Sequence, residues 1–223
     1  MKTHVDEARL QSLLDQSRTL HRGVAHDIAP AGLAAAQADD MAMLQTAASL
    51  ENVAVSTYTA ALNLEAVRGG NATVVAFLTT TRNQHADHAA AFNAAVTRAG
   101  GMVQTNPDPK YAALVQQAPL TTVADVLTLA VDLEDVATQT FVRAATLAGT
   151  PALRSLFVSV AAVEAQHRAI LLTVASVLDA TPAVAVTLHP DVARLPAATG
   201  SIGFPTSTTA VTQASPRDEG ALQ

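Results

Sequence analysis

The chain has 223 residues, with 19 acidic side chains against 13 lysines and arginines, which gives a formal net charge of -6. This acidic balance, without a cluster of basic residues, argues against nucleic acid as a partner. The absence of cysteine excludes disulfides, iron–sulfur clusters, thiolate metal sites and cysteine nucleophiles. Any bound metal must therefore be held by histidine, carboxylate or water.

The composition and the N-terminus indicate a soluble helical protein. Alanine and leucine, the strongest helix formers, are abundant. The N-terminal sequence lacks the apolar core of a signal peptide. No charge-free apolar run reaches the roughly 18 residues of a membrane span. We expect a cytoplasmic protein without a membrane partner; an exported protein whose leader had been removed would look the same.

Glycine, proline and capping residues divide the chain into predicted helices. The first covers residues 5–27 and, with a linker, forms an N-terminal segment, 1–38. The main domain, 39–180, contains four longer helices, predicted at 39–68, 71–99, 121–148 and 150–179. The remaining segment, 181–223, is rich in proline, threonine and alanine without a helical period, which is typical of an extended or disordered tail.

The connections between the four long helices are short, long and short. The long one, residues 102–120, contains three prolines and room for one short helical turn. It is long enough to run the length of a bundle, which favours an all-α four-helix bundle with one crossover over an up-and-down bundle with three short loops.

Two glutamates lie in otherwise apolar stretches of the first and third bundle helices. Glu51 and Glu134 are each preceded by leucine and followed seven residues later by an aromatic, Tyr58 and Phe141. Seven residues are two helical turns, so each glutamate and its aromatic share one face. We expect both carboxylates to point into the bundle. Tyr58 could donate a hydrogen bond near them, but a role as a core aromatic that matches Phe141 is favoured.

The second and fourth bundle helices carry two further pairs at one spacing. They are His85 with His88 and Glu164 with His167. Residues three apart lie on the same helix face, so the two side chains of each pair can bind one metal ion. Since the same chemical positions recur in both halves of the domain, the halves form an internal repeat of helix pairs.

Six potential ligands therefore meet in the predicted bundle centre: Glu51, His85, His88, Glu134, Glu164 and His167. They offer only hard or borderline donors, which suit iron, manganese or zinc. A divalent cation would also offset the cost of burying carboxylates among apolar residues. The neighbouring aspartates, which point to other helix faces, are predicted to be solvated: Asp87, Asp132 and Asp135. The histidines without partners in the pattern are predicted to lie on the surface: His4, His21, His26 and His189.

These six residues and the helix order resemble the ferritin-like superfamily, and more narrowly the bacterial ferritin-like domain proteins whose family includes plant desiccation-related proteins. The family pattern is a glutamate on two helices and Glu-x-x-His on the other two. His85 departs from it, because a glutamate would stand there. An alternative alignment would put Arg82 or Gln84 at the glutamate position, with His85 in the place of His167.

The resemblance implies a metal centre, with iron as the first choice of metal and manganese or zinc as alternatives. It also implies a ferroxidase-like oxidoreductase with a role in oxidative stress, which oxidises ferrous ions with oxygen or peroxide. In relatives the Glu-x-x-His glutamates bridge two metals, which neutral imidazole at His85 cannot do. Three carboxylates leave a net positive charge on two divalent ions, so we expect one ion or an unequal pair. The alternative is a non-enzymatic stress or interaction protein with a relict or structural site. A homodimer is expected.

Overall fold

The computed structural model describes residues 30–70, 72–118, 120–180 and 209–222. Every contact discussed below lies within the unit formed by residues 39–223. The predicted N-terminal helix, 5–27, lies outside the described residues, and so do the histidines predicted to lie on the surface, His4, His21, His26 and His189.

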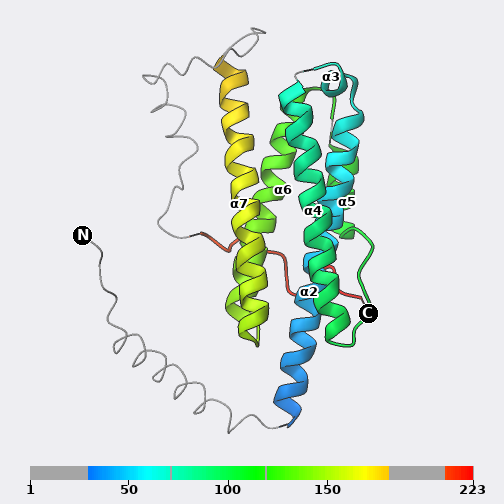
Figure 1. Cartoon of the computed structure of the whole chain (residues 1–223), viewed down its shortest axis with the longest axis vertical. Coiled ribbons are helices and arrows are strands. Elements are labelled where there is room, and N and C mark those ends of the chain that lie inside the picture. Colours follow the sequence, from blue (N-terminus) through cyan, green and yellow to red (C-terminus); the bar gives the residue numbers. More distant parts are fainter. Residues whose placement is uncertain (1–29, 71, 119, 181–208, 223) are drawn as a thin grey trace, which may run out of the picture. The chain divides into compact units, whose positions relative to one another are not determined.

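Four long helices build the bundle: α2 (Pro30–Asn63), α4 (Ala72–Arg98), α6 (Val123–Leu147) and α7 (Pro151–Ala180). In Figure 1, α2 and α7 run in one direction and α4 and α6 in the other. The connection from α4 to α6 travels from one end of the bundle to the other and includes α5 (Pro109–Gln117). Within the described residues all regular secondary structure is helical. The predicted all-α bundle with one long crossover is confirmed, and the packing is consistent with a ferritin-like bundle.

Local capping chemistry explains where the crossover ends and α6 begins. The Thr122 side chain accepts a hydrogen bond from the Asp125 backbone (3.2 Å), and the Asp125 carboxylate accepts one from the Thr122 backbone (2.8 Å). This reciprocal capping box satisfies two helix-end donors at once. The predicted single turn in the crossover is a longer helix, because Asp108 caps α5 by accepting from the backbones of Lys110 and Tyr111.

The first bundle helix differs from the prediction at both ends. It begins at Pro30 rather than near Asp39, because proline is tolerated in the first helical turn, where its missing N–H is not needed. It ends at Asn63 rather than Arg68, since Leu64 has an extended backbone (φ -66°, ψ 135°) and a separate short helix, α3 (Glu65–Arg68), follows.

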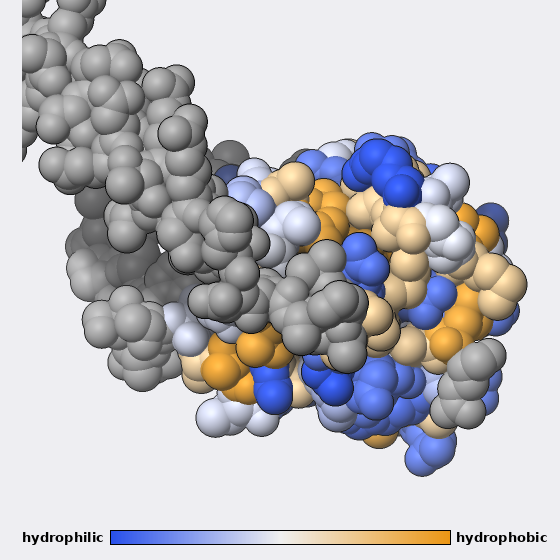
Figure 2. Space-filling model, turned by 90° about the horizontal axis from the view of Figure 1, so that it is seen from below, coloured by the Kyte–Doolittle hydropathy of each residue, from blue (hydrophilic) through white to orange (hydrophobic). Residues whose placement is uncertain are grey.

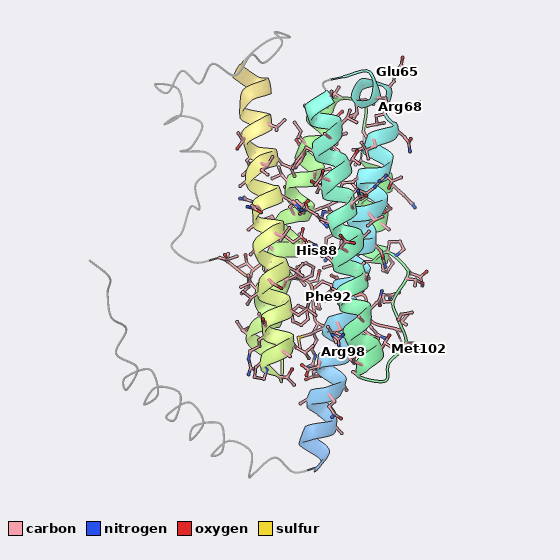
Figure 3. All side chains as sticks on the ribbon, viewed as in Figure 1. Glu65, Arg68, His88, Phe92, Arg98 and Met102 are labelled. Atoms are coloured by element: carbon pink, nitrogen blue, oxygen red, sulfur yellow. The ribbon has the colours of Figure 1, made fainter. Side chains whose placement is uncertain are left out.

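The core is divided into two apolar layers. One contains the rings of Phe92, Phe141 and Phe157, with the Phe92 centroid 5.2 Å from Phe141 and 5.4 Å from Phe157. The other is built around buried side chains nearer the opposite end of the helices: Tyr58, Val67, Leu78, Leu127 and Leu171. Figure 3 shows His88 and Phe92 one turn apart on the side of α4 that faces α7. The polar residues of the site lie along the helices between these two layers.

Residues 209–222, which we call the C-terminal strap, lie against the bundle without regular structure (Figure 1, red). Buried polar side chains of several helices bind its backbone. The Ser215 N–H donates to Thr140 Oγ1 on α6 (2.9 Å), and Thr46 Oγ1 on α2 donates to the carbonyl of Arg217 (2.9 Å). The strap therefore joins α2 to α6 along the half of the bundle that holds the phenylalanine layer.

The helix surface carries several apolar side chains. By length and composition alone, Pro151–Ala175 of α7 is apolar enough to cross a membrane (hydropathy 1.3). A third of that apolar window is buried, and the inward face of the helix carries the buried side chains of Phe157, Glu164 and His167. In the view of Figure 2, hydrophobic residues form separate groups between hydrophilic ones rather than one continuous apolar surface.

Candidate metal centre

The structure brings all six predicted ligands together in the middle of the bundle, from all four long helices. Five of them are buried with at most 3% of their surface exposed: Glu51, His85, Glu134, Glu164 and His167. The sixth, His88, has 14% of its side chain exposed and lies nearest to solvent. The cluster is therefore closed to bulk water on almost every side.

Helical spacing explains why these side chains meet at one level. Glu51 and Glu134 each stand two turns before an aromatic of the core, Tyr58 and Phe141. On the other two helices, the apolar residues before and after the ligand pairs pack in the two hydrophobic layers. The apolar residues on either side of each ligand fix the helix rotation, so the ligand must face inward.

His85 occupies the centre of the cluster and contacts carboxylates with both ring nitrogens. Its Nδ1 lies 2.7 Å from Glu51 Oε2 and 3.6 Å from Glu164 Oε2. Its Nε2 lies 3.2 Å from Glu134 Oε1. Glu51 on α2 and Glu134 on α6 are thereby linked through one imidazole. His85, which stands where a glutamate is expected, is thus the cluster residue that contacts all three carboxylates.

The other two histidines each face a pair of carboxylates with Nδ1. His88 Nδ1 lies 2.7 Å from Glu164 Oε1 and 3.6 Å from Glu51 Oε1. His167 Nδ1 lies 3.5 Å from Glu134 Oε2 and 3.4 Å from Glu164 Oε2. Atoms that share one cation at about 2.1 Å each lie roughly 3 to 3.4 Å apart. The contacts of His167 are thus of the length expected between ligands of a common ion.

The donors fall into two groups, within each of which all donor atoms lie within 4.8 Å of one another. We call Glu51, His88 and Glu164 the α2–α4 subsite, and Glu134, Glu164 and His167 the α6–α7 subsite. His85 belongs to both groups, and so does Glu164.

Four buried atoms of the cluster have no hydrogen-bond partner: Glu51 Oε1, His88 Nδ1, Glu134 Oε2 and Glu164 Oε1. His88 Nδ1 and Glu164 Oε1 are close but not aligned for a hydrogen bond. Buried polar atoms without partners are rare, because each forfeits the hydrogen bonds that water would supply. All four belong to groups that can ligate cations, and a cation at each subsite would satisfy the atoms that belong to that subsite. The residues present therefore fit a divalent metal.

Without metal, the cluster balances its carboxylates with protons. Burial raises the pKa of Glu164, and the charges of Glu51 and Glu134 raise it further, to about 7. Burial works against protonation of His88, but contacts with Glu164 and Glu51 raise its pKa to about 9. For His85, too, burial is outweighed by the charges of Glu134 and Glu164, so its pKa lies well above the usual value. A metal ion must displace these protons in order to bind.

Two residues outside the ligand set hold ligands in place. Tyr58 Oη donates a hydrogen bond to Glu134 Oε1 (2.5 Å), so this residue is more than the core aromatic we predicted. The seven-residue spacing from Glu51 already placed Tyr58 on the inward face. Gln84 Oε1 accepts from His167 Nε2 (2.7 Å). No sequence signal identifies this contact of Gln84, which the alternative alignment places at the glutamate position.

Of the three aspartates predicted to be solvated, Asp87 and Asp132 are exposed. Asp135 is only half-buried and has partners, since it accepts from Gln139 (2.7 Å) and pairs with Arg168 (3.0 Å). This pair links α6 to α7 beside the ligands Glu134 and His167.

Comparison with known families identifies one match. The model of the ferritin-like domain matches residues 37–176, which is more than half of the chain and includes the six clustered residues. No curated protein and no solved structure matches the chain.

Proposed function

Because the chain belongs to the family of ferritin-like domains, we propose that it binds divalent metal ions, iron first among them, at the centre of its bundle. One observation carries this proposal. The cluster contains three carboxylates and three imidazoles, and four of its buried ligand atoms have no hydrogen-bond partner. Each subsite contains at least one of these four atoms.

The donor types narrow the choice of metal. Carboxylate oxygens and imidazole nitrogens are the ligands of iron, manganese and zinc, and no thiolate is present to select softer ions. Three carboxylates leave a net positive charge on two divalent ions. A second ion should therefore bind more weakly than the first, or together with a small anion.

Iron at this site would supply one-electron redox chemistry, with oxygen or peroxide as the oxidant. The protein would then act in the response to oxidative stress. The chain's own part is to exclude water and to provide carboxylates for the higher charge of the oxidised ion. A cavity of about 20 Å³ adjoins Glu51, Tyr58, His85 and Glu134 between α2 and α6, and its other lining residues are apolar. A space of this size holds about one water-sized molecule, which supports access by a small oxidant.

The second candidate function is that of a non-enzymatic stress-related or interaction protein, in which the site has a structural role. The observation that favours it is the pairing of His85 with Glu51 and Glu134, which links two of the carboxylates through the cluster's own imidazole. In this case the fold would not depend on metal, and bound iron would not turn over.

Metal content tests the proposal. The protein is purified without chelators, incubated separately with ferrous iron, manganese and zinc, and desalted, and bound metal per chain is then measured. We expect near-stoichiometric metal in the natural sequence and a large loss in Glu164→Ala, which removes the carboxylate common to both subsites. The matched control is Glu65→Ala, at an exposed position on α3.

Substoichiometric binding of all three metals by the natural sequence would refute the proposal. If iron binds, the absorbance of ferric ion after oxygen is added separates the two candidates. A rise over repeated additions of ferrous iron indicates an oxidase, whereas stable ferrous protein indicates a passive site.

A further inference from the structure

The α6–α7 subsite is oriented by a residue on a third helix, Gln84. A carboxamide oxygen can only accept, so its contact with His167 Nε2 (2.7 Å) requires a proton on that nitrogen. The other nitrogen, Nδ1, is then the atom available as a ligand. It faces Glu134 Oε2 and Glu164 Oε2. Gln84 thus fixes both the ring orientation of His167 and the nitrogen that faces the carboxylates.

Tyr58 has the corresponding effect on Glu134. Its hydroxyl donates to Oε1, which also lies 3.2 Å from His85 Nε2. Both partners therefore engage the same carboxylate oxygen. Glu134 Oε2 is left without a hydrogen-bond partner and faces His167 Nδ1 at 3.5 Å. Tyr58 is itself 97% buried, since its exposed fraction is 3%, and its ring stacks on His85 with centroids 5.2 Å apart.

The α2–α4 subsite has no such support. Among the residues that the structure describes, no side chain outside the cluster hydrogen-bonds to Glu51 or His88. His88 is also the most exposed ligand, with 14% of its side chain accessible. The orientation of the His88 imidazole therefore depends on the cluster itself, whereas Gln84 already orients His167, which lowers the entropic cost of ion binding at the α6–α7 subsite.

We propose that the two subsites are unequal, and that the first cation binds at the α6–α7 subsite because Tyr58 and Gln84 hold Glu134 and His167 ready for it. This inference rests on the proposed metal-binding function and deepens it, since it names the order of filling and the two positioning residues that set it. Residues that orient ligands in this way typically contribute 10- to 100-fold to metal affinity.

A titration with Co²⁺, followed by its visible absorption, tests the order of filling. Metal-free protein is titrated, and the affinities of the first and second ions are obtained separately by competition with a chelator. We expect Tyr58→Phe and Gln84→Leu each to weaken the first ion by about 10-fold or more and to change its absorption bands. The affinity of the second ion should not change.

Two controls separate positioning from folding. Gln84→Glu keeps an acceptor for His167 Nε2 and should retain the affinity of the natural sequence for the first ion. Tyr111→Phe removes the hydroxyl of a buried tyrosine on α5, which contacts Ser215 rather than the cluster. It should leave both affinities unchanged. If leucine at position 84 prevents folding, Gln84→Asn removes the same contact, because its amide is one methylene shorter.

The possible outcomes are distinct. If Tyr58→Phe and Gln84→Leu (or Gln84→Asn) bind the first ion as tightly as the natural sequence does, the inference is overturned. The same holds if the first ion is weakened by His88→Gln but not by His167→Gln. If the natural sequence binds no Co²⁺, Fe²⁺, Mn²⁺ or Zn²⁺ at all, the proposed function itself has failed.

Discussion

His88 Nδ1 lies 2.7 Å from Glu164 Oε1, yet neither atom has a hydrogen-bond partner, because the two groups are not aligned for one. The distance alone suggests a simple ion pair. The misalignment leaves both atoms without a hydrogen bond, so both could serve a cation that approaches from the interior of the cluster. His88 belongs only to the group of ligands around Glu51, whereas Glu164 belongs to both groups.

We therefore predict that His88→Gln lowers the number of zinc ions bound per chain toward one, because it removes a ligand of the α2–α4 subsite alone. Equilibrium dialysis followed by elemental analysis measures this number. Asp87→Asn is the matched control, since Asp87 is exposed on the same helix and lies outside both ligand groups. Unchanged zinc content in His88→Gln would show that His88 is not a ligand.

We predict that His85→Glu raises the affinity for the second ion. This change restores the fourth carboxylate of the family pattern, so that two divalent ions are neutralised. The same change should lower the melting temperature of the metal-free protein, because a buried carboxylate then replaces the imidazole that links Glu51 to Glu134. Calorimetric titration and thermal melts with and without metal measure the two effects. A second ion bound no more tightly than in the natural sequence would argue against the charge explanation.

The metal-free protein should lose stability as pH rises from 6.5 to 9. The pKa of His88 is about 9 in the fold against an ordinary 6.5, so its stabilising contribution is complete below pH 6.5 and is lost as pH passes 9. Glu164, with a pKa of about 7, acts in the same direction between pH 4.5 and 7. Thermal melts in the presence of a chelator measure the trend.

His88→Gln should flatten this dependence between pH 6.5 and 9. Saturating zinc should oppose it, since metal binding requires the unprotonated imidazole. An equally steep loss of stability in His88→Gln would assign the trend to another group.

The C-terminal strap should be sensitive to a single methyl group at Gly220. A Cβ at this position would lie 1.9 Å from Ser49 Oγ and 2.8 Å from Ser49 Cβ, and Ser49 is fully buried. We predict that Gly220→Ala lowers the free energy of unfolding by about 1–3 kcal/mol, as is typical of overpacking. Denaturant unfolding measures this loss.

The matched control for this change is Gly69→Ala, where a Cβ would meet only Glu65 O at an ordinary 3.5 Å. Adding Ser49→Gly to the Gly220→Ala variant removes both close contacts and should restore part of the stability. A Gly220→Ala variant as stable as the natural sequence would mean that the strap can move aside at no cost.

Much of the fold follows from local signals in the sequence. Capping threonine, helix-ending glycines and helical spacing fix where α4, α6 and α7 lie and which way they face. The repeat of ligand pairs then indicates that the six polar residues meet. The sequence pattern places the start of α2 too late, because proline commonly marks a helix boundary, whereas the first helical turn accepts Pro30.

The remaining contacts depend on residues far apart in the sequence. Thr46 and Gln45 look like solvent-facing positions of α2, but their buried side chains bind the strap, with partners 171 to 177 residues away. The contact of Gln84 with His167 spans 83 residues and follows no periodic pattern. Neither helical spacing nor composition encodes such pairs.

The strap also bears on the order in which the molecule folds. Its hydrogen bonds to α2 join residues up to 177 positions apart, and the entropic cost of closing a loop grows with the logarithm of its length. The candidate metal cluster draws only on residues 51–167, and among the described residues no hydrogen bond joins its six side chains to the strap. Metal capture and seating of the strap can therefore be separate events, and backbone amides of the strap should exchange with solvent deuterium before those of the helices that hold the cluster.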